Sequence, residues 1–411
     1  QGTSATSRPD PIGGNVLSQL PLDGIRVLDL TWVVSGPQAT RILADLGAQV
    51  IKIEAPGRGD QMRRNPGMFT YFNRNKWNIS LNLATDEGRG LFRDLVKISD
   101  LVIENFSAGV MGRWGFDYAG LSSMNPSVVY VSMPGFGHSG PFHDYQSNGP
   151  TIQALSGQTF LAGLPGMPPA GWGYSYMDHT AGHYGAMAAL QALYYRNRTG
   201  RDQFVDLAQV ETALSLMGVY ILDAAVNNRS QGKPNLPIGN RSQYPPAAPH
   251  GVYPCKGDDN WCAIAVFTED EWIRFRTAIG DPDWANQPMF GTVDERTAHV
   301  EVLDAHVAEW TKQHDSQEVM NLLQEHGIRA GMVQTPLQRA DYDPQLEERM
   351  HIVEIEDAEG RVVRVDSLPM TVPARSHEDY HIASSSDENN HVVFGSLLGL
   401  REPDMNALAE H

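Results

Sequence analysis

Short apolar segments alternate with helical patterns through the first half of the chain, and this alternation restricts the possible folds more than any other feature. Residues 25–30 and 49–54 have the length and the Ile, Val and Leu content of buried strands, and the residues between them repeat apolar side chains at helical spacing. Ser35 is a candidate N-cap, since a proline follows shortly, and Gly47 is a candidate C-cap. Together these elements form a βαβ unit, which predicts parallel strand pairing with a right-handed crossover.

The same pattern continues along the chain. It predicts a helix over residues 85–97, strands over 101–104, 128–132 and 204–208, and an Ala-rich helix over 182–195. Alternation of this kind indicates an α/β fold with a parallel sheet.

A chain of 411 residues is too long for one ordinary core, so we expect more than one unit. Residues 227–249 are rich in Asn, Ser, Gly and Pro, which is typical of a linker. Beyond them the sequence predicts a smaller α+β domain, with a hairpin, helices over 269–279, 294–313 and 316–325, and the segment 329–333. The expected organisation is a tail over residues 1–20, the first part of a large α/β domain over 21–226, the linker over 227–249 and the small domain over 250–335, followed by a hairpin over 351–365 with its tip at Glu359-Gly360.

The charge balance argues against a nucleic acid as the main partner. The chain has 31 Lys and Arg against 49 Asp and Glu, a net charge of −18, whereas a phosphate backbone requires clustered positive charge. No apolar run approaches the roughly 20 residues of a membrane span, and residues 1–20 lack the basic and apolar regions of a signal peptide. Cys255 and Cys262 flank a turn and are expected to pack on facing strands, without a disulfide framework or a metal. We therefore expect a cytoplasmic protein.

Three familiar catalytic patterns are incomplete in this sequence. The turn after residues 25–30 has one glycine, Gly36, followed by a proline, where a dinucleotide-binding loop needs three glycines. His179 and His183 have the spacing of two zinc ligands on one helix, but the glutamate of that motif is absent. Ser175 lies between two tyrosines and lacks the second glycine of a nucleophile elbow. NAD binding, zinc catalysis and serine hydrolysis are all disfavoured.

Asp178 is the residue that local sequence marks most clearly for chemistry. It lies at the junction between a loop rich in Gly and aromatic residues and the Ala-rich helix. A carboxylate at a helix N-terminus is stabilised as the anion by unpaired N–H groups and by the helix dipole. One interpretation is a plain N-cap. The other is a carboxylate nucleophile, held ionised and desolvated in a pocket of Trp172, Tyr174 and Tyr176, and local sequence does not choose between them.

A series of short motifs in a fixed order resembles the class III CoA-transferases, the group of formyl-CoA transferase, carnitine CoA-transferase and α-methylacyl-CoA racemase. The resemblance runs from about residue 21 to residue 400. Each motif is weak alone, but their common order makes the resemblance specific. The motifs are PLDGIRVLDL over residues 21–30, LGAQVIKIE over 46–54, GDQMR over 59–63, Asn75-Lys76, Glu104-Asn105-Phe106, Thr199-Gly200-Arg201 and GIRAG over 327–331.

The resemblance implies a nucleophilic aspartate at the start of the helix that follows the long loop, which in this chain is Asp178. In that mechanism the carboxylate attacks an acyl-CoA donor, an aspartyl-CoA thioester forms, and an acceptor acid leaves as its own CoA ester. On family grounds we expect succinyl-CoA as the donor. Acyl-CoA is then a substrate, and neither a tightly bound cofactor nor a metal is implied. The pocket must be dry because water would hydrolyse the anhydride intermediate.

The resemblance also implies a set of CoA contacts. Lys76 and Arg113 are chemically suited to phosphate groups, although an ordinary surface charge is the alternative for each. Trp77-Asn78 replaces an Arg-Ser pair that is common in the family, which removes one expected phosphate contact and offers Trp77 as a stacking surface for adenine. Residues 240–246 have no counterpart of the glycine-rich loop of formyl-CoA transferase. The implied contacts are Val33, Val34, Asn75, Lys76, Asn105, Phe106 and Arg113.

Two alternatives to CoA transfer stay open. The racemases need a histidine before the turn at residues 155–157, and the aligned residue here is Asn148, with His143 five residues earlier, which favours the transferase. The other alternative is a non-catalytic CoA-binding subunit of a heteromeric enzyme. The family fold implies an open, Rossmann-like large α/β domain that residues 336–411 return to complete. It also implies that two chains interlock as a homodimer or pair with a paralogous subunit.

Overall fold

The computed structural model describes residues 20–227, 239–356, 360–370, 372 and 376–409. The predicted tail up to residue 19, residues 228–238 of the predicted linker and the hairpin tip at Glu359 lie outside the described residues. The chain divides into two compact units, which are described separately. Unit 1 comprises residues 1–159, 171–230 and 347–411, and unit 2 comprises residues 160–170 and 231–346.

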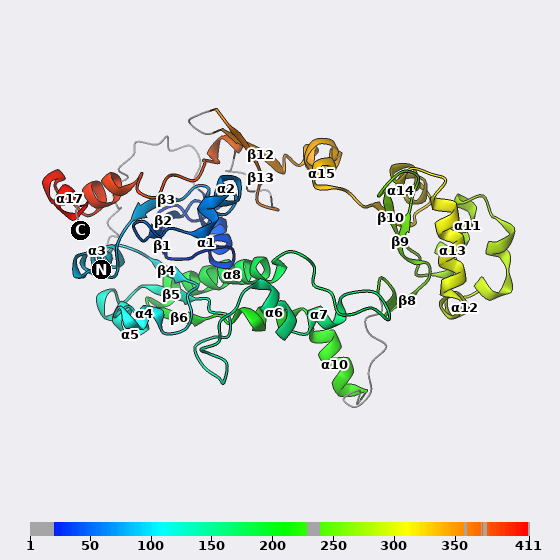
Figure 1. The fold of residues 1–411 in the computed structure, drawn as a ribbon, viewed down its shortest axis with the longest axis horizontal. Coiled ribbons are helices and arrows are strands. Elements are labelled where there is room, and N and C mark those ends of the chain that lie inside the picture. The colour runs from blue at the N-terminus through cyan, green and yellow to red at the C-terminus, as the bar shows by residue number, and fades with distance from the viewer. Residues whose placement is uncertain (1–19, 228–238, 357–359, 371, 373–375, 410–411) are drawn as a thin grey trace. The chain divides into compact units, whose positions relative to one another are not determined.

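Unit 1 contains a six-stranded sheet whose neighbouring strands all pair in parallel, in the order β3-β2-β1-β4-β5-β6. The labels in Figure 1 follow this order from top to bottom. The predicted parallel sheet is confirmed, but β3 was not predicted, since four residues with two apolar side chains do not stand out from a loop. The strands are β1 (Arg26–Asp29), β2 (Gln49–Glu54), β3 (Trp77–Ser80), β4 (Leu101–Glu104), β5 (Val129–Ser132) and β6 (Gln203–Asp206).

Helices cover both faces of this sheet, and each face has its own apolar core. On one face, α1 (Ser35–Asp45) and α8 (Tyr176–Thr199) bury Leu43 and Ala189 against the strands. On the other face, α3 (Asp86–Lys97) and α5 (Tyr118–Met124) bury Phe92 and Leu121. The small residues of α8 allow close helix packing, because a Cβ atom at Gly182 would lie 2.6 Å from the Cβ of Gln38 on α1.

Two helix starts differ from the sequence prediction. The N-cap of α1 is Val34 rather than Ser35, and no side chain caps the helix. Helix α8 begins at Tyr176, before the predicted residue 182, because the polar first turn hides its helical pattern. The remaining helices of unit 1 up to residue 227 are η1 (Gln61–Arg64), α2 (Pro66–Asn73), α4 (Val110–Arg113), α6 (Gly149–Leu155), α7 (Gln158–Leu161), which runs into unit 2, α9 (Gln209–Ser215) and α10 (Gly218–Val226).

The C-terminal segment of unit 1 is attached by polar side chains. Its hairpin, β12 (Ile352–Glu356) and β13 (Val362–Asp366), confirms the hairpin predicted over residues 351–365. Asp366 accepts a hydrogen bond from the Arg41 guanidinium at 3.1 Å. The Asn75 side-chain oxygen accepts the His381 N–H at 2.7 Å. The last elements are η5 (His377–Asp379), the π-helix η6 (His391–Leu397) and α17 (Glu402–Ala409).

Unit 2 is a small α+β assembly, yellow-green in Figure 1. The predicted hairpin is present, but Cys262 pairs with Tyr253 rather than with Cys255, which follows the end of β9. Both thiols are free and buried in the core of this unit. The helix predicted over 294–313 is two helices that meet at His299. The elements are β7 (Ser242–Gln243), β8 (Pro246–Ala247), β9 (His250–Pro254), β10 (Trp261–Ala265), α11 (Glu269–Ala278), η3 (Asp283–Asn286), η4 (Pro288–Phe290), α12 (Val293–Ala298), α13 (Val300–Thr311), α14 (Ser316–Glu325), β11 (Arg329–Met332), α15 (Pro336–Tyr342) and α16 (Pro344–Glu348), which ends in unit 1.

No single helix among the described residues has the length and apolar character needed to cross a membrane. The pair α9 and α10 reaches that length and composition together, but the two helices are bent by 67° at their junction.

Candidate active site

Asp178 lies in the first turn of α8, on the wall of a cavity of about 600 Å³ in unit 1. The interpretation as a plain N-cap is wrong, since the N-cap is Ser175 and Asp178 is the third helical residue. The Asp178 N–H donates to the Ser175 carbonyl at 3.0 Å. The carboxylate is therefore not needed to cap the helix, and it is part of the cavity wall instead.

The cavity is built by loops that follow the carboxyl ends of β1, β4, β5 and β6, together with the N-terminal ends of α6 and α8. In open α/β sheets this edge is where ligands bind, because the loops diverge there. Polar and apolar residues alternate around the wall. They are Trp32, Val33, Val34, Ser35, Asn105, Phe106, Ser107, Ala108, Pro134, Gly135, His143, Tyr145, Gln146, Ser147, Asn148, Gly149, Pro150, Ser175, Asp178 and Gln209.

The electrostatic state of Asp178 is set mainly by burial. Desolvation raises the pKa of its carboxyl group to about 6, and a hydrogen bond with the Ser175 side chain opposes this rise. At neutral pH the group is still mostly ionised, with little hydration to remove before it reacts. The sequence predicted that the helix N-terminus favours the ionised form of Asp178. In the structure, burial acts in the opposite direction and has the larger effect on its pKa.

Gly149, which the sequence analysis did not identify, is in close contact with this carboxylate. A Cβ atom at residue 149 would lie 2.5 Å from Asp178 Oδ2 and 2.9 Å from Ser175 Oγ. Gly149 is the first residue of α6, whose N-cap Asn148 forms a reciprocal capping box with Thr151. The backbone of α6 therefore limits the position of the Asp178 side chain directly. The Gly-Pro pair after Asn148 was the available sequence signal.

Four of the predicted CoA contacts line the same cavity as Asp178: Val33, Val34, Asn105 and Phe106. The Asn105 side chain is already engaged, since its amide donates to Trp32 O at 2.9 Å and to Ser35 Oγ at 3.1 Å, and its oxygen accepts the Trp32 N–H at 2.8 Å. This residue joins two loops of the wall. Arg113 ends α4, is exposed and does not line the cavity.

Asn75 and Lys76 are placed away from the cavity. Lys76 is fully buried, and its ammonium group bonds to Asp29 at 3.1 Å, to Pro37 O at 3.1 Å and to Asn73 at 2.8 Å. Burial lowers the pKa of Lys76 to about 8 despite the nearby carboxylate of Asp29. The predicted phosphate role of Lys76 is not compatible with this environment, because the charge is already neutralised inside the protein. Asn75 bonds to Asp45 at 2.8 Å and holds the C-terminal segment.

The predicted aromatic pocket is also in a different place. The Tyr176 ring contacts those of Trp172 and Tyr174, each at a centroid distance of 5.5 Å. All three residues are about half exposed, and none of them lines the Asp178 cavity. The aromatic residues of the wall are Trp32, Phe106 and Tyr145. Trp77 packs against the core of unit 1 and is only partly exposed, which leaves little of it for stacking on adenine.

Glu104, the last residue of β4, fixes the start of the loop that follows this strand. Its carboxylate accepts the Phe106 N–H at 2.7 Å and the Tyr130 hydroxyl at 3.0 Å. Burial raises the pKa of Glu104 to about 7. Glu104 was identified from the sequence only as part of a motif, although its position at a strand end indicated the ligand-binding edge of the sheet.

The histidines of the sequence analysis have separate surroundings. The His179 ring packs against Phe72 in a tilted arrangement and forms a hydrogen bond with the Tyr174 hydroxyl at 3.0 Å, and burial lowers the pKa of His179 to about 4. No group of three potential ligands for a metal is found among the residues described. His143 and Asn148 both line the Asp178 cavity, but the Asn148 side chain is engaged in capping α6.

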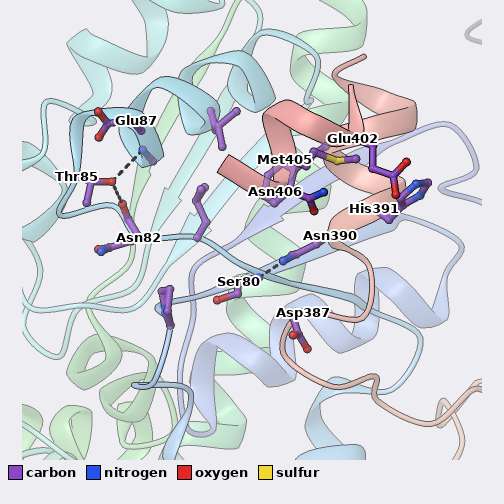
Figure 2. Close-up of a pocket in the computed structure, with 15 residues that line it drawn as sticks. Ser80, Asn82, Thr85, Glu87, Asp387, Asn390, His391, Glu402, Met405 and Asn406 are labelled. Carbon is purple, nitrogen blue, oxygen red and sulfur yellow. Dashed lines mark hydrogen bonds between the residues drawn. The ribbon is translucent and has the colours of Figure 1, made fainter. Parts of the chain in front are cut away.

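A second cavity, of about 670 Å³, lies where the C-terminal segment meets α3 (Figure 2). Glu402, Met405 and His391 lie on one side, and Asn82, Thr85 and Glu87 on the other. Three carboxylates and no Lys or Arg line it. Its charge is therefore unsuited to the phosphate groups of CoA.

Known proteins similar to this chain all point to one family. Residues 22–380 match the model of CoA-transferase family III. The chain is 32% identical over 396 residues to succinyl-CoA–D-citramalate CoA-transferase of Chloroflexus aurantiacus, covering 94% of this chain and 96% of that protein. It is 31% identical over 357 residues to a formyl-CoA:oxalate CoA-transferase of Rhodopseudomonas palustris, covering 82% and 84%.

A solved structure leads to the same assignment. The CaiB/BaiF family protein of Brucella suis superposes with a TM-score of 0.81 at 29% identity, covering 92% of this chain and all of that one. The fold of this chain therefore belongs to a known architecture. The chain is a member of CoA-transferase family III, and it is a CoA-transferase.

Proposed function

We propose that this enzyme transfers CoA from succinyl-CoA to a free carboxylic acid through a covalent intermediate on Asp178. The observation that carries the proposal is one mostly ionised, largely buried carboxylate in the wall of a 600 Å³ cavity at the carboxyl edge of a parallel sheet. A desolvated carboxylate is an effective nucleophile toward a thioester.

The reaction proceeds through alternating anhydrides and thioesters. An Asp178 oxygen attacks the thioester carbonyl of the donor, which gives a mixed anhydride and releases the CoA thiolate. The thiolate attacks the Asp178 carbonyl, so that an aspartyl-CoA thioester forms and succinate leaves with the bridging oxygen. The acceptor carboxylate then attacks this thioester, and the thiolate leaves again. Attack of the thiolate on the acceptor carbonyl gives the new acyl-CoA and restores Asp178.

The cavity wall supports this chemistry in two ways. Trp32, Phe106 and Tyr145 supply apolar surface that limits water near the anhydride. The N-terminus of α1 opens on the same cavity at Val34 and Ser35 and has no side-chain cap, so its dipole favours negative charge on the reacting oxygens.

The choice of donor and acceptor is supported by the relatives. Three of them are named as succinyl-CoA transferases, with D-citramalate, mesaconate and L-malate as acceptors. The residues that line the cavity include no Lys or Arg, and the polar side chains among them include His143, Gln146, Ser147 and Gln209. These groups suit an acceptor that carries a hydroxyl or carbonyl group beside the reacting carboxylate.

Oxygen labelling tests the covalent route. With an acceptor labelled by ¹⁸O in its carboxylate, one label should pass to Asp178 and then to the succinate released in the next turnover, where mass spectrometry detects it. Asp178→Asn should abolish transfer, while Asp144→Asn, an exposed carboxylate that does not line the cavity, should not change it. Unlabelled succinate during sustained turnover would refute the aspartyl intermediate.

The racemase alternative has one observation in its favour, the presence of His143 in the same cavity as Asp178. Incubating a 2-methylacyl-CoA in deuterated water tests it. Exchange at Cα with no CoA transfer to any acid of a panel would support the racemase and exclude the transferase assignment.

A second copy of the chain is proposed to cover α10, as expected for an interlocked dimer. Val219, Leu222 and Val226 are 70%, 63% and 72% exposed, and their spacing places them on one face of this helix. An exposed apolar stripe of this kind commonly marks a protein interface. Light scattering should give a dimer for the wild type and a smaller species for Leu222→Asp, whereas a dimer that survives this change would exclude α10 from the interface. A relative named as a beta subunit makes a heteromer the alternative.

A further inference from the structure

Val33 has an unusual backbone conformation on the wall of the Asp178 cavity. Its φ angle is +67°, in the left-handed region, and its side chain is 40% exposed. A β-branched residue is strongly disfavoured there, because its Cβ substituents crowd the backbone. Such a conformation persists only when the surrounding structure enforces it, and it often occurs at functional sites.

The residues around Val33 hold it from both sides. Asn105 bonds to both backbone polar groups of Trp32 and to the Ser35 hydroxyl, at 2.8 to 3.1 Å. The Val33 N–H itself points to the Asp60 carboxylate, with nitrogen–oxygen distances of 3.1 and 3.2 Å. The loop between β1 and α1 therefore has little freedom to relax.

Asp60 belongs to a group of buried charges beneath this loop. Its carboxylate pairs with Lys52 at 3.2 Å, and both side chains are fully buried. Lys52 also donates to Thr31 O at 2.7 Å, which fixes the residue two positions before Val33. Burial of such a pair gives little net stability, since the desolvation cost is comparable to the ionic attraction. Stability alone therefore does not explain why Asp60 and Lys52 are buried here.

We propose that Asp60 is a positioning residue for the reaction at Asp178. By accepting the Val33 N–H, it holds Val33 in the left-handed conformation and keeps the N-terminal turn of α1 directed at the cavity. This inference rests on the proposed function only in so far as activity is the readout. Asp60 does not line the cavity and acts through Val33.

A rescue experiment tests the proposal. Asp60→Asn should lower kcat/KM about tenfold or more, because a neutral amide holds the strained residue less tightly. Val33→Gly changes the cavity wall itself, so it is the reference for the double variant, and its glycine adopts positive φ without strain. In this Val33→Gly background, Asp60→Asn should lower kcat/KM by less than about threefold. A loss as large as the one that Asp60→Asn causes with Val33 present would overturn the proposal, because Asp60 would then act otherwise than through Val33.

Two further measurements keep the test decisive. If Asp60→Asn does not fold, Val33→Pro replaces it, since proline removes the N–H and forces negative φ; more than half of the wild-type activity in this variant would overturn the proposal. Amide hydrogen exchange without substrate measures the stability of the loop between β1 and α1, independently of the reaction that the enzyme catalyses. The Val33 amide should exchange at least tenfold faster in Asp60→Asn, while β4 stays protected and the exposed control Asp86→Asn leaves both unchanged. Unchanged exchange at Val33 would likewise overturn it, even if CoA transfer itself were absent.

Discussion

Substitution of Gly149 by alanine is the most direct probe of how the fold holds Asp178, the proposed nucleophile. The added Cβ would lie 2.5 Å from Asp178 Oδ2 and 2.9 Å from both the Cβ and Oγ atoms of Ser175. Ordinary van der Waals contacts of a Cβ atom begin near 3.4 Å. The carboxylate must therefore move by about 0.9 Å, or α6 must retreat by as much.

The expected cost follows from this displacement. A misplacement of about 1 Å at a reacting group is typically worth about 100-fold in rate, so kcat should fall by about that factor in Gly149→Ala. Overpacking of a tight site costs about 1–3 kcal/mol of unfolding free energy, so the protein should remain folded. The KM for acyl-CoA should change little, since residue 149 does not alter the remaining wall.

The assay is CoA transfer from succinyl-CoA to an acid panel, followed by chromatography and mass spectrometry, together with urea unfolding. Gly90→Ala is the matched control, because Gly90 lies inside α3 with nothing within 4 Å of its added Cβ. It should stabilise the protein by up to about 1 kcal/mol and leave kcat unchanged. A wild-type kcat in Gly149→Ala would refute the idea that α6 sets the position of Asp178.

Three further predictions follow from the buried charges. Since burial raises the pKa of Asp178 to about 6, kcat/KM should fall about tenfold per pH unit below that value, and a rate that is constant from pH 5 to 8 would contradict this. The folded-state pKa of Asp178 lies above the usual 3.8, so its ionised form destabilises the fold, and the full cost is present above about pH 6. Asp178→Asn should therefore raise the free energy of unfolding by about 1–3 kcal/mol at pH 8 and by little at pH 4, measured by urea unfolding. An equal increase at both pH values would show another cause. Lys76→Met should lose about 3–5 kcal/mol, as it leaves the buried Asp29 unpaired, whereas a stable variant with a tenfold higher KM for acyl-CoA would restore the phosphate role.

The strands of the sheet were largely predictable because each carries a compact apolar run. Residues 49–54 and 101–104 were predicted with their observed bounds. The strand at Trp77–Ser80 was not, because an edge position allows polar side chains such as Asn78 to bond to the C-terminal segment, at 2.9 Å to Ser384. That contact joins residues about 300 positions apart and leaves no local pattern.

Some residues of the candidate site could be predicted because local sequence patterns mark their positions. Asp178, Val33 and Phe106 follow strand ends or begin a helix, and such positions are marked in sequence by neighbouring glycines and motifs. The surroundings of a side chain are not marked. Lys76 has the composition of a phosphate ligand, and only the fold shows that Asp29 already neutralises it inside the protein. Trp172, Tyr174 and Tyr176 are close to Asp178 in sequence, but none of the three lines its cavity.

The distribution of charge adds a constraint on how the enzyme binds CoA. The chain has a net charge of −18, and the cavity wall in unit 1 carries Asp178 but no Lys or Arg. In the proposed reaction, the anionic carboxylate of Asp178 and an anionic acceptor would therefore meet where the attraction comes from dipoles, chiefly the uncapped N-terminus of α1. Arg and Lys side chains form strong charge-assisted hydrogen bonds with phosphate groups, and those of unit 1 lie outside this cavity. Arg113, exposed at the end of α4, is one such residue in unit 1. A separate location for the phosphates would let the acidic cavity release its anionic products readily, while CoA remains bound by its nucleotide end.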